Sequence, residues 1–552
     1  MHPFFRFAVL TASALAAATC VQAQAGNPWA STGTHRFQSR EALAGAPMKA
    51  GEAIHVAVSL RLRNQAALDA MTNALMAGQS SDHLTRDEFQ ARFAPTNADV
   101  TAIVSHLRQA GFANIRVADN HMLVSADGTA GAVQAAFNTE LRHYTVQDRD
   151  AYANTSDAQV PAALAGIVRA VHGLQNVSKV HSMLKPATAA ASSPAVQGHS
   201  PLDFPVIYHA DGLPAATNAT IGIIADGDIS QSLADLKDFA QANHLSPPDV
   251  KEVDVGPKGY DTTGELEWDL DSQTSLAAAG GAVKQMIFYV GTSLEDAPLT
   301  EAFNQAVSDH VAQVINVSLG ECEDYAKESG IEAASDAIFQ VALAQGQTFS
   351  VSSGDSGSYE CGSAKGGESY PAVSPYVMAI GGTQVSTTDQ THWAAETTWG
   401  CDSDASCLMF GGSGGGVSDS ESAPSWQIAS GVLKGSKQRA IPDIALDGDP
   451  ASGALILNQG LTAQVGGTSL SAPLFAGFWA RLESMNDNRL QVPASALYKY
   501  GVDKKSAKTL FHDITKGTIG GYDAATGWDD ASGFGSLDVG KLATFIGSHT
   551  GF

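Results

Sequence analysis

The octapeptide Gly-Gly-Thr-Ser-Leu-Ser-Ala-Pro at residues 466–473 places a serine at the start of a predicted helix. Pro473 suits a first helical turn, because the N–H that proline lacks has no partner there. We expect the Ser469 hydroxyl to face the free N–H groups and positive end of this helix, although a serine that only caps the helix has the same setting. Apolar residues follow at helical spacing: Leu470, Leu474, Phe475, Phe478 and Leu482.

A nucleophilic serine needs a base, and no histidine of the C-terminal part offers itself. None stands in the His-Gly-Thr context of a subtilisin-type base, and His310 closes a predicted helix, where it can interact with the helix dipole. We therefore expect no Ser-His-Asp triad. The six histidines after residue 200 are His209, His244, His310, His392, His512 and His549.

Two carboxylates four residues apart offer another base. Glu267 and Asp271 share one face of a predicted helix at residues 264–279, where like charges repel. A solvated acidic face that includes Glu265 and Asp269 is the alternative.

A carboxylate can take the serine proton. Glu267 would accept the proton of Ser469, and Asp271 would hold and polarise Glu267. Two close carboxyl groups share one proton because they resist ionising together. A carboxylate base works best near its own pKa, so we expect an acidic pH optimum.

A further acid follows a predicted strand. Residues 348–358 read Thr-Phe-Ser-Val-Ser-Ser-Gly-Asp-Ser-Gly-Ser and place Asp355 on a glycine-rich turn. Subtilisin-like enzymes carry an oxyanion-binding asparagine at the matching turn. Asp355 can replace its amide only when protonated, as a buried acid can be.

These segments together resemble the sedolisins, the serine-carboxyl peptidases that include kumamolisin and tripeptidyl peptidase I. The resemblance rests on Glu-Trp-Asp-Leu-Asp at 267–271, Ser-Gly-Asp-Ser-Gly at 353–357 and the octapeptide at 466–473, which is also similar to the subtilisin nucleophile segment. It implies a subtilisin-like catalytic domain, a Ser469-Glu267-Asp271 triad and Asp355 as the oxyanion acid.

The resemblance also implies one calcium ion per chain near the C-terminus. Residues 511–530 look like the family's calcium site, although alanine stands at 525 where glycine is usual. All the implied ligands are oxygens, as calcium prefers. They are the carboxylates of Asp513 and Asp529 and the carbonyls of Ile514, Ala525 and Gly527.

Two positions depart from related patterns. Leu319 replaces the tryptophan of a family Ser-Trp-Gly segment, which bears on the outer hydrogen-bond network and on specificity. Asp226 stands where subtilisins keep a triad aspartate, but the sedolisin triad does not use that position, so we interpret it as structural.

Composition narrows the function classes. The chain has 552 residues, a formal net charge of −25 at pH 7 and a pI near 4.9, so nucleic acid and anionic membranes are poor partners. Residues 1–25 have a positive start, an apolar run and small residues near the end, which predicts a signal peptide and a secreted, extracellular protein. We expect a monomer.

The cysteines predict disulfides. Removing Cys20 with the signal peptide leaves four, an even number in an exported chain. Zinc is the alternative, but no Cys-x-x-Cys motif or histidine cluster accompanies them. The predicted pairs are Cys322 with Cys361 and Cys401 with Cys407.

A linker rich in proline, alanine and serine at residues 186–200 divides the chain. Proteases cut exposed, flexible chain, so we expect the mature protein to start between residues 186 and 201. Residues 26–185 alternate strand and helix patterns and predict a small α+β domain. Residues 83–95 resemble the sedolisin propeptide, which shields the active site until it is cut away. We therefore expect this domain to pack over the strand ends where Ser469, Glu267 and Asp355 meet. Residues 201–552 predict an α/β domain with a parallel sheet and helices on both faces.

The leading hypothesis is a secreted, calcium-dependent, acid-acting endopeptidase made as a zymogen, with its own propeptide as inhibitor and protein or peptide substrates. A tripeptidyl-peptidase-type exopeptidase is an alternative, and it would need a cleft closed at one end. A catalytically silent binding homologue is less favoured, because Glu267, Asp271, Asp355 and Ser469 are all present.

Overall fold

The computed structural model describes residues 28–38, 43–146, 148–187, 196–362, 367–389 and 391–552. The predicted signal peptide, with Cys20, and most of the predicted linker lie outside these residues. Within the described ranges, no helix is both long and apolar enough to cross a membrane.

An eight-stranded sheet forms the centre of the C-terminal part. All neighbouring strands pair in parallel except β19 and β20, which are antiparallel. The predicted subtilisin-like α/β architecture is confirmed, and the antiparallel strand is an addition to the prediction. The order is β13 (Val250–Val255), β14 (Val283–Gly291), β12 (Ala216–Asp226), β15 (Val314–Val317), β17 (Thr348–Ser352), β19 (Met378–Thr387) and β20 (Trp393–Thr398), with β23 (Ile444–Asp447) also paired to β19.

Helices cover both faces of this sheet. α13 (Thr468–Met485) lies along four central strands with α7 (Glu265–Ala278) beside it, and α6 (Ser230–Ala242) packs on α7. α8 (Asp296–Asp309) and α10 (Ile331–Ala344) pack together on the other face. Because α7 is enclosed by its neighbours, nearly all its side chains are buried.

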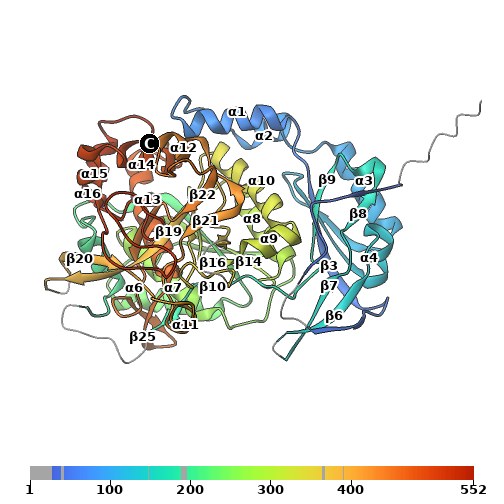
Figure 1. The fold of residues 1–552 in the computed structure, drawn as a ribbon, viewed down its shortest axis with the longest axis horizontal. Coiled ribbons are helices and arrows are strands. Elements are labelled where there is room, and N and C mark those ends of the chain that lie inside the picture. The colour runs from blue at the N-terminus through green and yellow to red at the C-terminus, as the bar shows by residue number, and fades with distance from the viewer. Residues whose placement is uncertain (1–27, 39–42, 147, 188–195, 363–366, 390) are drawn as a thin grey trace, which may run out of the picture.

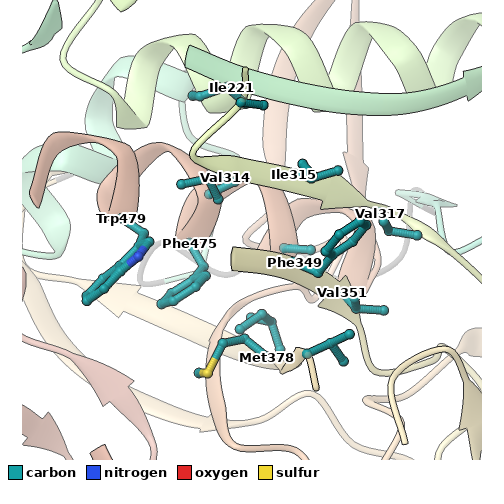
Figure 2. Packing of buried hydrophobic residues seen from close by; sticks show 14 of the residues in the cluster. Ile221, Val314, Ile315, Val317, Phe349, Val351, Met378, Phe475 and Trp479 are labelled. Atoms are coloured by element: carbon teal, nitrogen blue, oxygen red, sulfur yellow. The ribbon is translucent and has the colours of Figure 1, made fainter. Parts of the chain in front are cut away.

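The core lies between the sheet and α13. Figure 2 shows Ile221, Phe349 and Met378 from three strands close to Phe475 and Trp479 of the helix. All five side chains are at most 1 % exposed. Burying each contributes roughly 1.5–3 kcal/mol, so this packing holds α13 firmly against the sheet.

The N-terminal part is a separate α+β unit, as predicted. A four-stranded antiparallel sheet has the order β4-β5-β3-β9 and is covered by α3 and α4. Thr85 and Thr96 form capping boxes that start α2 and α3. The elements are β1 (Trp29–Ser31), β2 (Leu43–Pro47), β3 (Ala53–Leu60), α1 (Gln65–Met76), α2 (Arg86–Arg92), α3 (Asn97–Gln109), β4 (Ala113–Val117), β5 (Leu123–Thr129), α4 (Ala130–Phe137), β6 (Leu141–Val146), β7 (Arg149–Asn154), β8 (Gln159–Pro161), η1 (Ala162–Leu164) and β9 (Val168–His172).

This N-terminal unit packs beside the catalytic part rather than over the end of its sheet. In Figure 1 its sheet stands next to α8 and α10, and α1 and α2 extend across the top. Buried polar contacts cross the boundary: Asn120 Nδ2 donates to Asn304 Oδ1 at 2.7 Å, and Gln175 Nε2 donates to Asp296 Oδ2 at 2.8 Å. The prediction that the domain itself lies over the strand ends therefore needs correction; the chain that follows it does so.

That following chain is extended. It forms β10 (His181–Ser182) and β11 (Lys185–Pro186), which pair with β16 (Leu319–Cys322) and β25 (Leu461–Gly466) of the catalytic part. The remaining elements are η2 (Pro201–Asp203), α5 (Phe204–Ile207), α9 (Glu323–Ser329), β18 (Ser369–Tyr370), α11 (Asp404–Phe410), β21 (Gly416–Ser422), α12 (Ser425–Ser430), β22 (Gln438–Ile441), β24 (Ala454–Asn458), α14 (Ala494–Gly501), α15 (Lys504–Leu510), β26 (Phe511–His512), β27 (Ser536–Leu537) and α16 (Val539–Ile546).

Both predicted disulfides are present. Cys322 bonds to Cys361, and Cys401 bonds to Cys407. The zinc alternative for these four cysteines is thereby removed, since a disulfide sulfur is not a thiolate ligand.

Candidate active site

Ser469 lies in the first turn of α13, directly after β25, and is fully buried. Its Oγ donates a hydrogen bond to the carbonyl of Ser318 at 3.3 Å. Gly467 precedes the helix with a φ of 97°, a conformation that glycine adopts without strain. The predicted position at the mouth of a core helix is therefore confirmed. The expectation that Pro473 lies in the first helical turn is wrong, because α13 already begins at Thr468 and Pro473 lies in its second turn.

Glu267 and Asp271 lie on α7 and are 2 % and 0 % exposed, so the solvated-face interpretation is wrong for them. Ser318 Oγ donates to Asp271 Oδ1 at 2.5 Å, and Asn316 Nδ2 donates to Ser318 Oγ at 3.0 Å. Within the described residues, Glu267 Oε1 and Asp271 Oδ2 are buried without a hydrogen-bond partner. Each of these oxygens is therefore free to carry a proton.

Burial sets the protonation of the pair. It raises the pKa of Glu267 well above its usual range, and the nearby charge of Asp271 acts in the same direction. The hydrogen bond from Ser182 and the nearby Ser469 hydroxyl act on this pKa in the opposite direction. Burial also raises the pKa of Asp271, opposed by hydrogen bonds from Ser318 and Asn316. The pair therefore holds a proton more readily than exposed carboxyls would.

Asp355 follows β17 and faces the start of α13. The backbone N–H and the hydroxyl of Thr468 donate to its Oδ1 at 2.7 and 2.9 Å. Its Oδ2 is buried and has no hydrogen-bond partner among the described residues. Burial raises the pKa of Asp355 to about 7, although the charge of Lys185 acts in the opposite direction. Below that pH, Oδ2 can carry a proton.

The extended chain after the N-terminal unit runs through this group of residues. Ser182 pairs with Leu319 on one side, and Lys185 pairs with Gly466 on the other. The Ser182 hydroxyl donates a hydrogen bond to Glu267 Oε2. Residues 181–186 therefore occupy the place of a peptide strand added to the edges of the cleft.

The Met183 carbonyl lies at the start of α13. The Ser469 N–H donates to it at 3.0 Å, and the Met183 N–H donates to the Ser318 carbonyl at 3.2 Å. A Cβ atom on Gly467 would lie 2.1 Å from Met183 O and 2.7 Å from Asp355 Oδ2, so both oxygens converge on this glycine. The peptide bond from Met183 to Leu184 is thus presented to Ser469 and Asp355.

Comparisons with known proteins agree with this arrangement. Residues 41–177 match the family described as pro-kumamolisin, activation domain, and residues 270–535 match the subtilase family. Sedolisin of Pseudomonas sp. (strain 101) is 45 % identical over 550 residues, which cover 94 % of this chain and 93 % of that protein. The chain belongs to the sedolisin family.

Other relatives support the same assignment. Xanthomonalisin of Xanthomonas sp. (strain T-22) is 41 % identical over 600 residues, covering 99 % of this chain and 71 % of that protein. The solved structure of Pseudomonas sedolisin, a serine-carboxyl proteinase, matches with a TM-score of 0.61 and 46 % identity, over 65 % of this chain and all of that one. This sedolisin-family chain is therefore a serine-type peptidase with a propeptide activation domain.

The structure brings together the four residues predicted for catalysis and adds others that the sequence reasoning missed. Thr468 positions Asp355, Asn316 and Ser318 position Asp271, and Ser182 contacts Glu267. The sequence could have identified Asn316 and Ser318, because the segment at 316–321 resembles a family motif. No sequence motif marks Ser182 and Met183, because their role depends on where the chain re-enters the cleft.

The two unusual positions have structural settings. Asp226 ends β12 and is 7 % exposed; burial and the charge of Asp261 raise its pKa to about 7. Leu319 is fully buried in β16, where it pairs with Ser182. It therefore lies directly beneath the bound segment, where a larger side chain would change the floor of the cleft.

The predicted calcium residues meet on one turn. The Gly527 N–H donates to both Asp513 oxygens at 3.0 and 3.2 Å, and the Ala525 N–H donates to Asp529 Oδ2 at 2.7 Å. Burial raises the pKa of Asp529 to about 6, and no basic side chain of the described residues lies within 4 Å of either carboxylate. Two carboxylates that contact the same turn and have no basic partner among the described residues are oxygen ligands of the kind that a hard divalent cation takes.

Proposed function

We propose that the chain is a secreted, acid-acting serine-carboxyl endopeptidase made as a zymogen. The observation that carries this proposal is the Met183 carbonyl, which accepts a hydrogen bond from the Ser469 N–H at 3.0 Å beside Asp355 and the Glu267–Asp271 pair. A peptide carbonyl in this position has its nucleophile, its base and its oxyanion donors within one site.

In the proposed reaction, Ser469 Oγ attacks the carbonyl carbon of a bound peptide while Glu267 accepts the hydroxyl proton. Asp271 shares that proton and holds Glu267 in place. The carbonyl oxygen becomes an oxyanion, which accepts hydrogen bonds from the Ser469 N–H and from protonated Asp355.

Glu267 then gives the proton to the leaving amine, and the peptide C–N bond breaks to leave an acyl ester on Ser469. A water attacks this ester, again losing a proton to Glu267, and Ser469 recovers its proton as the acid product leaves. Glu267 therefore works as base and acid in turn, with no histidine in the cycle.

The course of the bound segment favours endopeptidase activity. Strand pairing continues on both sides of the Met183–Leu184 bond, through β10 and β11. A cleft that holds chain on both sides of the reacting bond accepts an internal peptide bond. The tripeptidyl-peptidase alternative requires a wall three residues before that bond, where this chain instead continues to Val180 and the N-terminal unit.

The test compares one peptide with a free and with an acetylated N-terminus, each digested at pH 4 by activated enzyme. We expect equal cleavage of both at internal bonds, and no cleavage by a Ser469→Ala variant. Tripeptide release from the free peptide alone would support the exopeptidase. Full activity of Ser469→Ala would contradict the proposed nucleophile, and a native enzyme with no activity on any peptide would support a silent binding homologue.

We also propose one calcium ion at the C-terminal site. Asp513 and Asp529 would supply carboxylate oxygens, and Ile514, Ala525 and Gly527 would supply carbonyl oxygens. When bound, the ion would neutralise the two carboxylates and fasten the loop between β26 and β27. The protein is proposed to work as an extracellular monomer on protein and peptide substrates.

A further inference from the structure

A second group of potential metal ligands comes from segments that supply no active-site residue: the end of α5, β26 and the start of α16. His209, His512 and Asp538 each offer one ligand atom within 4.8 Å of the others. His209 Nδ1 lies 3.0 Å from Asp538 Oδ2, and the Asp538 side chain is 3 % exposed. His512 Nε2 is buried and has no hydrogen-bond partner among the described residues.

The neighbours of this group hold it in place. The His512 ring stacks on Trp393 with centroids 4.1 Å apart, and Trp393 Nε1 donates to Glu396 Oε2 at 2.9 Å. Asp538 Oδ1 accepts the Lys541 N–H at 3.0 Å as the cap of α16, so the carboxylate is fixed in position while Oδ2 contacts His209 Nδ1 and Lys541 Nζ. Two of the three ligands are thus oriented before any ion binds.

We propose that His209, His512 and Asp538 form a transition-metal site, with Zn²⁺ as the ion that suits them best. Two imidazole nitrogens and one carboxylate oxygen are a common ligand set for zinc, and water would complete a tetrahedron. Calcium does not suit this group, because it takes six to eight oxygen ligands.

The site would join three distant segments. His209 follows α5 near the start of the catalytic part, His512 ends β26, and Asp538 caps α16 near the C-terminus. A metal bound to all three would hold both ends of the catalytic part together. Its role would therefore be structural, and independent of the peptidase reaction.

An ion pair is the competing interpretation. Lys541 Nζ lies 2.7 Å from Asp538 Oδ2, and a protonated His209 would also pair with this carboxylate. This interpretation leaves His512 Nε2 without a function. Lys541 is 57 % exposed on a flexible side chain, so an incoming cation can displace it into solvent.

The test measures Zn²⁺ binding to the full-length Ser469→Ala chain by calorimetry, in buffer that contains excess calcium to fill oxygen sites. We expect one Zn²⁺ per chain and a higher melting temperature with zinc, because a ligand that binds only the folded state stabilises it. Co²⁺ in place of Zn²⁺ should give the visible absorption bands of a tetrahedral site.

Three variants decide between the interpretations. His209→Asn should weaken zinc binding at least about tenfold, and asparagine tolerates the φ of 58° at this position. His244→Asn is the matched control, since His244 is exposed with a φ of 57°, and it should bind zinc like the parent. Lys541→Met should bind zinc more tightly, because it removes the competing ammonium group.

Absence of zinc binding in the parent would overturn the proposal. Equal zinc affinity in His209→Asn and His244→Asn would overturn it as well, since zinc would then bind elsewhere. None of these readouts depends on peptidase activity, so failure of this site would be distinct from failure of the proposed catalytic mechanism.

Discussion

At the scale of single residues, three buried acids, Glu267, Asp271 and Asp355, replace the histidine of an ordinary serine peptidase reaction with groups that hold protons at low pH. Asp355 illustrates the consequence. Its Oδ1 is occupied by Thr468, so only Oδ2 can face a developing oxyanion. That oxygen is a donor when protonated and a repulsive charge when not.

The first prediction concerns this proton. Because burial raises the pKa of Asp355 to about 7, the acid is protonated below that pH and loses its proton above it. We expect kcat/KM to fall as pH rises through about 7. Asp355→Ala should lower kcat at pH 4 by roughly 10²–10³-fold, the usual effect of losing one oxyanion donor.

Asp355→Asn provides the control for that assignment. Its amide donates at any pH, and its oxygen can still accept from Thr468, so it should retain more activity than Asp355→Ala. The fall in kcat/KM on the alkaline side should occur at a higher pH in this variant than in the parent. If kcat/KM of Asp355→Asn falls at the same pH as that of the parent, a group other than Asp355 causes the fall.

At the scale of elements, β10 and β11 decide how the precursor is held inactive. The sequence-based prediction placed the mature N-terminus between residues 186 and 201, within a flexible linker. The structure instead places the bond after Met183 at Ser469, before that range. A first cut after Met183, followed by trimming within the linker, agrees with both the structure and the predicted mature N-terminus.

The second prediction is therefore a product that begins at Leu184 early in acid conversion. A mass-spectrometric time course at pH 4 should detect it before chains that begin between 186 and 201. Gly467→Ala should block the cut, because its Cβ would lie 2.1 Å from Met183 O and the φ of 97° disfavours alanine. If the first new terminus lies in the linker itself, the bond at Ser469 is not the first one cut.

The third prediction concerns the loop between β26 and β27. Without a cation, Asp513 and Asp529 hold the turn at 525–527 only through hydrogen bonds from its backbone N–H groups. We expect excess chelator to lower the melting temperature by several degrees and to reduce activity, and calcium to restore both.

Asp529→Asn should remove most of this calcium dependence. The Ala531 and Ser532 N–H groups donate to Asp529 Oδ1 at 3.0 and 2.8 Å, and an asparagine oxygen can keep those bonds. A melting curve that chelator leaves unchanged in the parent would argue against any ion at this site.

At the scale of the whole molecule, buried acids are distributed well beyond the active site. Burial raises the pKa of Asp226 to about 7 and that of Glu483 to about 8. Across the propeptide boundary, burial raises the pKa of Asp296 to about 7 and that of Glu321 to about 8. The fold as a whole therefore favours protonated carboxyl groups.

The fourth prediction follows from this distribution. The folded state binds more protons than the unfolded chain between pH 4 and pH 7, so the stabilisation is present at acid pH and is lost as pH rises through about 7. The net charge of −25 adds repulsion at neutral pH. The melting temperature of Ser469→Ala should fall by at least about 5 °C from pH 5 to pH 8. A higher melting temperature at pH 8 would contradict this account.

The fifth prediction is that the precursor stays whole near pH 7 and converts near pH 4. Burial raises the pKa of Asp355 to about 7, so below that pH this acid gains the proton that it needs to donate to an oxyanion. Gel analysis across this pH range tests the conversion. Adding a trace of active enzyme to the Ser469→Ala precursor shows whether a second molecule can cut. Equal conversion at pH 7 would disprove the acid trigger.

The sequence by itself determined much of this protein. Period-two and period-3.6 patterns predicted the alternating strands and helices, and the helix start at Ser469, because these patterns reflect local backbone geometry. The spacing of Glu267 and Asp271 placed both on one helical face for the same reason. The even number of cysteines led to the correct disulfides.

Only the tertiary structure decided whether Glu267 and Asp271 form a buried pair or an exposed acidic face. Enclosure of α7 by α6 and α13 buries Glu267 and Asp271, and local sequence cannot distinguish that from an exposed acidic face. Met183 meets Ser469, and His209 meets His512, only because the chain returns across hundreds of residues, and such contacts depend on the packing of whole elements rather than on any local pattern.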